Sequence, residues 1–174
     1  MENRQLTLMD LLNSRENRVF HQKELLDKYD CVLVSMTLNI PGAVKDKPEY
    51  RRVLREGMKR METLIDGEKA DIKVLYSEVR ELVTGPEGYI CVSADDPAVI
   101  KKMAVSVEEA DMLGRIFDID VITKSGGISR SNLGAGPRKC LICDEDAKVC
   151  ARGRTHEMGQ LIAKIDEIIA ESVI

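Results

Sequence analysis

The chain has 174 residues, of which 44% are hydrophobic and 32% charged, a balance typical of folded globular proteins rather than disordered ones. Its net charge of −4 argues against general nucleic-acid binding, and no apolar run approaches the roughly 20 residues of a membrane-spanning helix. The amino terminus lacks the continuous apolar core of a secretory signal, and an odd number of cysteines, five, suits a reducing compartment, so we expect a cytoplasmic protein.

The first third of the sequence predicts two helices with a strand between them. Thr7 is a candidate N-cap for a helix that reaches about Tyr29, and its charged residues, Arg15 and Arg18 among them, are interpreted as a solvated face. Residues 31–40 form a β-rich run that ends at a Pro-Gly turn. Residues 48–65 carry apolar side chains at helical spacing, which predicts the second helix.

The rest of the chain predicts short segments of both kinds. In chain order these are an ambiguous stretch at 71–84, a strand at 89–94, a helix capped by Asp95 or Asp96 that reaches about Val107, a strand around Asp118 and Asp120, and a helix that begins near Thr155 or His156. Helices that alternate with a few strands indicate an α+β fold. We expect a single domain over residues 1–174, with helices packed on a mixed sheet of about four to five strands.

Asp118 and Asp120 stand one residue apart in the otherwise apolar run 113–123. Side chains two residues apart on a strand point to the same face, with Cα atoms roughly 6.5–7 Å apart. Two carboxylates on one face suit Mg²⁺, which fills its remaining positions with water and phosphates. A salt-bridged pair or a solvated sheet edge is the alternative. The apolar flanks, and Arg115 just before the pair, favour a phosphoryl-transfer site.

Cys140, Cys143, Cys150 and His156 have the type and number of ligands that tetrahedral zinc requires. The C-x-x-C pair is a good metal knuckle, whereas the spacing of Cys150 and His156 departs from the common patterns. The alternative is that the cysteines are small buried hydrophobes beside a capping histidine.

Residues 128–156 are basic within an acidic chain, with six Lys or Arg against three Asp or Glu. Such a segment could steer a polyanionic substrate or an acidic protein partner, and it could equally be a solvated face.

Taken together, six motifs resemble one family. In chain order they are SRENR with a following Gln (residues 14–22), PGAVKD (41–46), TGPEG (84–88), LGRIFDIDV (113–121), ISR (128–130) and PRKCLIC…VCARGRTH (137–156). Their order is that of apo-citrate lyase phosphoribosyl-dephospho-CoA transferases, also called citrate lyase holo-acyl-carrier-protein synthases. The resemblance spans nearly the whole chain, and six motifs in register are specific.

The resemblance implies a transferase with nucleotidyltransferase-like chemistry. Such enzymes take 2′-(5″-triphosphoribosyl)-3′-dephospho-CoA and transfer its phosphoribosyl-dephospho-CoA part to a serine of the citrate lyase acyl carrier (gamma) subunit, releasing pyrophosphate. The implied cofactor is Mg²⁺, held by the two carboxylates against the triphosphate. Neither nucleic acid nor a membrane is an expected partner.

The resemblance also assigns roles to individual residues. Asp118 and Asp120 are the expected Mg²⁺ ligands and Arg115 the expected phosphate neutraliser beside them. The expected substrate-binding residues are Lys45, Gly85, Gly88, Arg130, Arg138 and Arg154. One departure is that Asp111 and Met112 stand where the family usually has His-Pro, so Asp111 would have to supply any role of that histidine.

Two rival interpretations stay open from the sequence. One is the equivalent transfer to the carrier subunit of malonate decarboxylase, which takes the same prosthetic group. The other is a zinc-stabilised, non-catalytic module that binds the carrier through the basic segment.

Overall fold

A five-stranded sheet forms the centre of the computed structural model, which describes residues 6–68 and 72–172. The strands are β1 (Val32–Leu38), β2 (Lys73–Arg80), β3 (Glu87–Ser93), β4 (Phe117–Thr123) and β5 (Gly126–Ile128). Their spatial order is β2-β3-β1-β4-β5, and every neighbouring pair is antiparallel. The α+β class is confirmed, but the sheet is antiparallel rather than mixed. Short turns join β2 to β3 and β4 to β5, and only antiparallel neighbours can be joined in this way.

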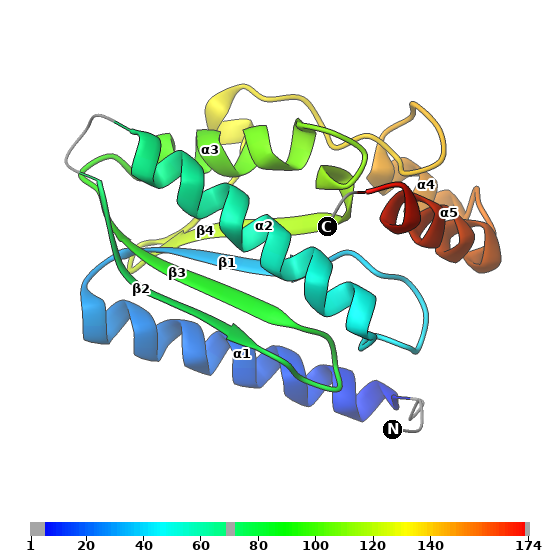
Figure 1. Ribbon diagram of the computed structural model, residues 1–174, viewed down its shortest axis with the longest axis horizontal. Helices are drawn as coiled ribbons and strands as arrows, with labels where there is room; N and C mark the ends of the chain where they lie inside the picture. The colour runs from blue at the N-terminus through cyan, green and yellow to red at the C-terminus, as the bar shows by residue number, and fades with distance from the viewer. Residues whose placement is uncertain (1–5, 69–71, 173–174) are drawn as a thin grey trace.

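Helices cover the two faces of the sheet unequally (Figure 1). Helix α1 (Leu8–Tyr29) lies on one face, and α2 (Pro48–Gly67) and α3 (Pro97–Glu109) lie on the other. Helices α4 (Ala147–Gly153) and α5 (Met158–Glu171) lie together at one end of the molecule. Two short 3₁₀ turns, η1 (Gly114–Ile116) and η2 (Arg130–Leu133), flank the last two strands.

The main core fills the space between the sheet and helices α2 and α3. Alternate residues of β1, Val32, Val34 and Met36, point into it and are almost completely buried. The opposite face holds a smaller cluster in which Leu33 packs with residues of α1 and β3. Of the 22 residues of α1, only Leu25 and Leu26 are buried. The amino-terminal half of α1 therefore lies over the sheet without packing tightly on it.

The local expectations are confirmed for most elements. The side chain of Thr7 accepts a hydrogen bond from the backbone N–H of Asp10 at the start of α1, and Asp96 caps α3 in the same way. The ambiguous stretch at 71–84 contains strand β2 (Lys73–Arg80), and its first residue lies outside the described residues. The last helix, α5, begins at Met158, later than expected, because the short helix α4 and the turn after it occupy residues 147–157. None of the helices in the described ranges has the length and apolarity to cross a membrane.

Strand β4 is held at its edge by side chains of α3. The backbone N–H of Ile119 donates to Glu108 at 2.9 Å, and Lys101 donates to the carbonyl oxygen of Ile119 at 2.8 Å. Both side chains are almost fully buried. Because β5 pairs only with the second half of β4, these two groups satisfy backbone positions that no neighbouring strand reaches. The first half of β4, with its two aspartates, is thereby fixed in place.

We predict that Gly114→Ala destabilises the protein, because η1 crosses the end of α3 so closely that a Cβ would lie 2.4 Å from the carbonyl oxygen of Val107. Overpacking of this kind typically costs about 1–3 kcal/mol, measured here as a lower free energy of unfolding in urea. Gly136→Ala is the matched control, since nothing lies within 4 Å of its Cβ position. Equal stability of the two variants would contradict the close approach.

Candidate active site

A cleft of about 220 Å³ lies under the amino-terminal half of α1. Its walls come from four segments that are far apart in the sequence. They are α1 (Leu11, Ser14, Arg15, Arg18), the end of β1 and the loop after it (Thr37, Leu38, Asn39, Ile40, Lys45), the turn between β2 and β3 (Thr84, Gly85, Pro86), and Asp118 of β4. The fold thus brings four of the six family-like motifs to one hollow.

Two contacts connect α1 to the turn between β2 and β3 and to the first residue of β3. The hydroxyl groups of Ser14 and Thr84 lie 2.9 Å apart, and the Nε of Arg18 donates to the carboxylate of Glu87 at 2.9 Å. Glu87 is buried, and the hydroxyl of Tyr89 also donates to it, so the Arg18 guanidinium neutralises an interior charge. These contacts fix the width of the cleft.

The cleft holds two cations that have no acidic partner in the part of the chain that the structure describes, Arg15 and Lys45. Burial, together with the positive charge of Arg15, lowers the pKa of Lys45. The Nζ of Lys45 donates to the carbonyl oxygen of Ile40, which orients it without neutralising it. Two cations that repel each other, of which Lys45 is partly desolvated, form a site that an anion would stabilise.

Gly85 permits the loop that carries Lys45 to approach the turn between β2 and β3. Its backbone φ of +114° is one that residues with a side chain rarely adopt. A Cβ at this position would lie 3.4 Å from the carbonyl oxygen of Lys45. Gly85 therefore lies in the lining of the cleft, and its expected role in substrate binding stays a prediction.

Asp118 and Asp120 lie on the same face of β4, as the alternation predicted. The residues between and beside them are buried in the main core, whereas both aspartates are exposed. In the sheet they stand opposite Thr37 and Ser35 of β1. Although its side chain reaches solvent, the protein atoms packed around Asp120 reduce its hydration, and this desolvation, together with the neighbouring charge of Asp118, raises the pKa of Asp120. No hydrogen-bonding or ionic partner of Asp120 is found among the described residues.

The arginine that contacts this pair is Arg138. Its Nη1 donates to Oδ1 of Asp118 at 2.9 Å, and its Nη2 donates to the carbonyl oxygen of Phe117. Arg115 is adjacent in sequence but donates at 3.3 Å to the carbonyl oxygen of Cys140, outside the cleft lining. Because Arg115 belongs to the 3₁₀ turn before β4, its side chain leaves the chain in a different direction from those of the strand.

The remaining residues singled out from the sequence lie elsewhere. Arg130 forms ion pairs with Glu108 and Glu109 of α3 at 2.8 and 2.7 Å, and Arg154 is the exposed C-cap of α4. A Cβ on Gly88 would lie 2.4 Å from the sulfur of Met58, so this glycine permits close packing of α2 on β3.

Asp111 also lies away from the cleft. It accepts hydrogen bonds from Arg60 of α2 and from the backbone N–H of Gly114, at 3.1 and 2.8 Å. These contacts place it at the junction of α2 and η1, and it is not among the residues that line the cleft.

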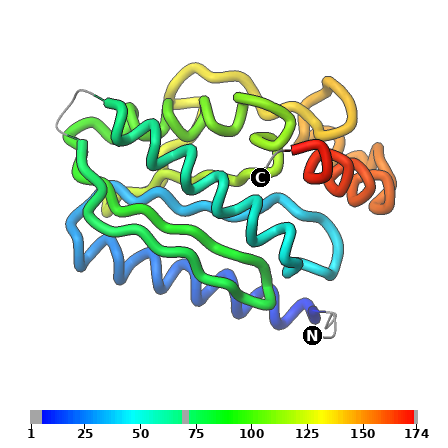
Figure 2. The backbone as a smooth tube through the Cα atoms, viewed as in Figure 1, coloured from blue at the N-terminus to red at the C-terminus, as the bar shows by residue number. Residues whose placement is uncertain are grey.

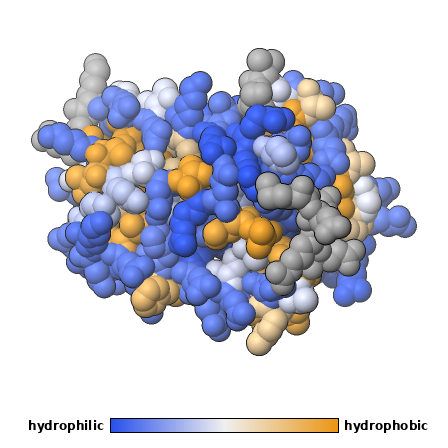
Figure 3. Space-filling view, turned by 60° about the horizontal axis from the view of Figure 1, so that its bottom comes forward, coloured by the Kyte–Doolittle hydropathy of each residue, from blue (hydrophilic) through white to orange (hydrophobic). Residues whose placement is uncertain are grey.

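The cleft contains functional candidates that the sequence reasoning missed, namely Arg15, Arg18 and Ser14. The two arginines had been interpreted as part of a solvated face, and Ser14 had been given no role of its own. Their helical spacing could have revealed them. Ser14, Arg15 and Arg18 follow Leu11 by three, four and seven positions, which puts all four residues on one side of a helix. Figure 3 shows the side of the molecule where α1 comes forward, with hydrophobic areas scattered among hydrophilic ones.

The four predicted zinc ligands are brought together. One ligand atom from each of Cys140, Cys143, Cys150 and His156 lies within 4.8 Å of all the others. Among the described residues, these form the only group of three or more His, Cys, Asp or Glu side chains placed to share a metal ion.

Comparison with known proteins agrees with the motif order. Residues 6–172 match the family model described as apo-citrate lyase phosphoribosyl-dephospho-CoA transferase. A Vibrio cholerae protein named probable apo-citrate lyase phosphoribosyl-dephospho-CoA transferase is 36% identical over 94% of this chain and 91% of its own length. An Escherichia coli protein named apo-citrate lyase phosphoribosyl-dephospho-CoA transferase is 34% identical over 94% of this chain and 88% of its own. The chain therefore belongs to the apo-citrate lyase phosphoribosyl-dephospho-CoA transferase family of enzymes.

Proposed function

We propose that this chain transfers the phosphoribosyl-dephospho-CoA group from 2′-(5″-triphosphoribosyl)-3′-dephospho-CoA to a serine of the citrate lyase acyl carrier subunit. The observation that carries the proposal is the cleft under α1, where Arg15 and Lys45 lie with Asp118. Two cations that have no acidic partner among the described residues, close to the carboxylate of Asp118, suit a polyanionic triphosphate.

The proposed step is a nucleotidyltransferase-type displacement at phosphorus. The serine oxygen of the carrier forms a bond to the phosphorus next to the ribose and its proton passes to solvent, while the bond from that phosphorus to pyrophosphate breaks and pyrophosphate leaves. Arg15 and Lys45 are placed to hold the negative charge of the triphosphate and of the departing pyrophosphate. The nucleophile comes from the partner, so the chain itself needs to supply only binding, orientation and charge.

Asp118 and Asp120 fit a hard divalent cation such as Mg²⁺. Both are carboxylates on one face of β4, and the carboxyl of Asp120, whose pKa is raised by burial and by the charge of Asp118, has no ionic partner among the described residues. When bound there, Mg²⁺ would neutralise charge on the triphosphate and on the departing pyrophosphate. Arg138 occupies only Oδ1 of Asp118, which orients this carboxylate and leaves Oδ2 for another ligand.

The direct test is mass spectrometry of apo acyl carrier subunit incubated with this protein, Mg²⁺ and triphosphoribosyl-dephospho-CoA. We expect a mass increase equal to the phosphoribosyl-dephospho-CoA group, which is lost when Mg²⁺ is chelated. The carrier subunit of malonate decarboxylase serves as the competing acceptor and is expected to react more slowly. No increase with a competent donor and carrier would overturn the proposal.

We predict that Asp118→Asn lowers the transfer rate by about two orders of magnitude or more, because the substitution removes a metal ligand and the partner of Arg138. Binding of the apo carrier, measured by calorimetry, should stay close to wild type. Asp66→Asn, at an exposed position of α2, is the control and should leave transfer unchanged. A wild-type rate in Asp118→Asn would remove Asp118 from the mechanism.

A second prediction concerns the alkaline side of the pH profile. The pKa of Lys45 is lowered, so kcat/KM for the donor should fall as pH rises through a value below the usual lysine pKa of about 10.4. Lys45→Arg keeps its charge in this range and should shift that decline to higher pH, whereas Lys45→Gln should raise the donor KM at every pH. Identical alkaline limbs for wild type and Lys45→Arg would exclude Lys45 as their origin.

A third prediction separates stability from activity at Asp120. Because its pKa is raised, the ionised carboxyl destabilises the folded state at neutral pH, so Asp120→Asn should raise Tm at pH 7. The difference from wild type should vanish as pH falls through the raised pKa towards the unfolded-state value of about 3.9. Added Mg²⁺ should raise the Tm of wild type but not that of the variant. If Asp120→Asn were less stable than wild type at pH 7, the ionised carboxyl of Asp120 would not be destabilising.

A further inference from the structure

Residues 129–157, between β5 and α5, have almost no hydrophobic core of their own. Of this stretch, only Cys140 and Cys150 are buried, and every other residue is exposed or half-buried. Figure 2 shows it in yellow to orange, passing α3 and reaching the end of the molecule where α5 lies. A segment that buries so little apolar surface needs another source of stability, such as a disulfide or a metal.

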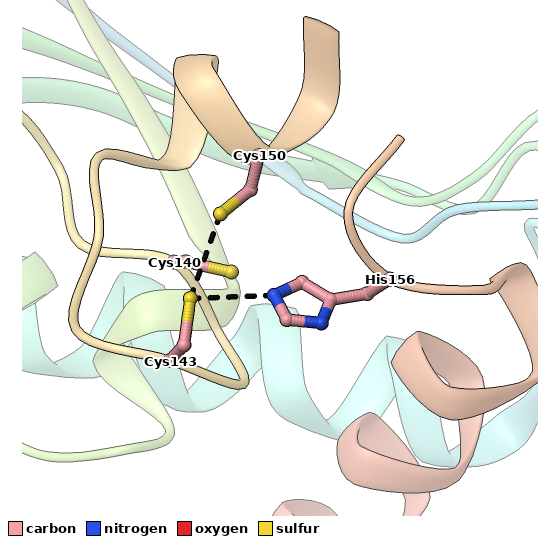
Figure 4. Close-up of side chains that lie close together, drawn as sticks. All are labelled: Cys140, Cys143, Cys150 and His156. Atoms are coloured by element: carbon pink, nitrogen blue, oxygen red, sulfur yellow. Dashed lines mark hydrogen bonds between the residues drawn. The ribbon is translucent and has the colours of Figure 1, made fainter. Parts of the chain in front are cut away.

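The two buried thiols are part of the four-residue cluster. The sulfur atoms of Cys143 and Cys150 lie 3.5 Å apart, and the sulfur of Cys143 lies 3.3 Å from Nε2 of His156. Figure 4 shows all four side chains pointing toward one another. A tetrahedral zinc site with Zn–S bonds of about 2.3 Å has sulfur atoms about 3.8 Å apart. The cluster is therefore close to the size that a zinc ion requires.

The backbone that presents these ligands is hydrogen-bonded into a defined shape. The N–H of Cys140 donates to the carbonyl oxygen of Glu145 at 2.7 Å, which closes the loop that carries Cys143. Cys150 is the one buried residue of α4. The N–H of Thr155 donates to the carbonyl oxygen of Cys150 at 3.1 Å, which turns the chain back and brings His156 to the cluster.

We propose that Cys140, Cys143, Cys150 and His156 bind one structural Zn²⁺. Three thiolates and an imidazole are the donor set that zinc prefers, and hard cations such as Mg²⁺ prefer oxygen. Four protein ligands complete the tetrahedron, so no position is left for water or substrate and the site is structural rather than catalytic. The unusual spacing between Cys150 and His156 is explained by α4 and the turn after it, which occupy that interval.

The zinc site lies next to the side chains that contact β4. Arg138 is two residues before Cys140 and donates to Asp118, and Arg115 donates to the carbonyl oxygen of Cys140. Zinc would therefore fix the position of Arg138 relative to Asp118. This consequence for catalysis rests on the proposed function, whereas metal binding itself does not.

The test is the metal content of the full chain, purified without chelator and measured by mass spectrometry of the elements. We expect about one zinc per chain in the wild type and its loss in both Cys143→Ala and His156→Ala. Cys31→Ala is the matched control: this buried thiol lies in the cluster under α1, and the variant should keep its zinc. Co²⁺ added to the chelated protein should give the absorption of a tetrahedral cobalt–thiolate site.

Limited proteolysis supplies a readout that is independent of transfer activity. Removal of zinc, or Cys143→Ala, should make residues 129–157 much more sensitive to cleavage, with the far-ultraviolet circular dichroism of the rest largely kept. Wild-type protein that holds no zinc and takes up no Co²⁺ would overturn the proposal. So would a disulfide between Cys143 and Cys150 in freshly purified protein, or a zinc content that Cys143→Ala and His156→Ala leave unchanged.

Discussion

The fixed register of β4 is the constraint on which the rest of the structure depends. Phe117, Ile119 and Val121 are buried in the main core, and Glu108 and Lys101 of α3 bind both backbone groups of Ile119. A shift by one residue would put two carboxylates into that core. The strand can therefore hold Asp118 and Asp120 only on the opposite face, in front of the loosely packed half of α1.

The cleft contains charged groups whose arrangement is unfavourable for folding. Arg15 and Lys45 are like charges brought close together, and so are Asp118 and Asp120. The charges of Lys45 and Asp120 are unfavourable in the unliganded protein, whereas Arg138 pairs with Asp118 and other ion pairs, such as that of Arg18 with Glu87, hold the walls in place. Sites of this kind are typical of proteins that bind a charged ligand, because the ligand supplies the missing counter-charge.

The carboxyl-terminal part of the chain is stabilised by different means. The sheet and helices α2 and α3 share an extensive apolar core, whereas residues 129–157 bury only two thiol side chains. This segment nevertheless delivers Arg138 to the first half of β4. The geometry of the carboxylate pair thus depends on a segment whose own order cannot come from hydrophobic burial.

The sequence by itself determined the local features of this protein. Thr7 and Asp96 are caps because their side chains reach nearby N–H groups, and the aspartates of β4 share a face because strands alternate. The motif order also determined the family. The caps and the strand alternation depend on residues a few positions apart, so the spacing of these residues in the sequence is enough to predict them.

Only the tertiary structure decided which distant groups meet. Arg138 contacts Asp118, whereas Arg115, which is closer in sequence, does not, and Arg15 lines the same cleft as Lys45. The order of the strands and the close approach of His156 to three cysteines were likewise established by the tertiary structure. These contacts follow from how helices and strands pack over long separations, and local periodicity carries no information about that packing.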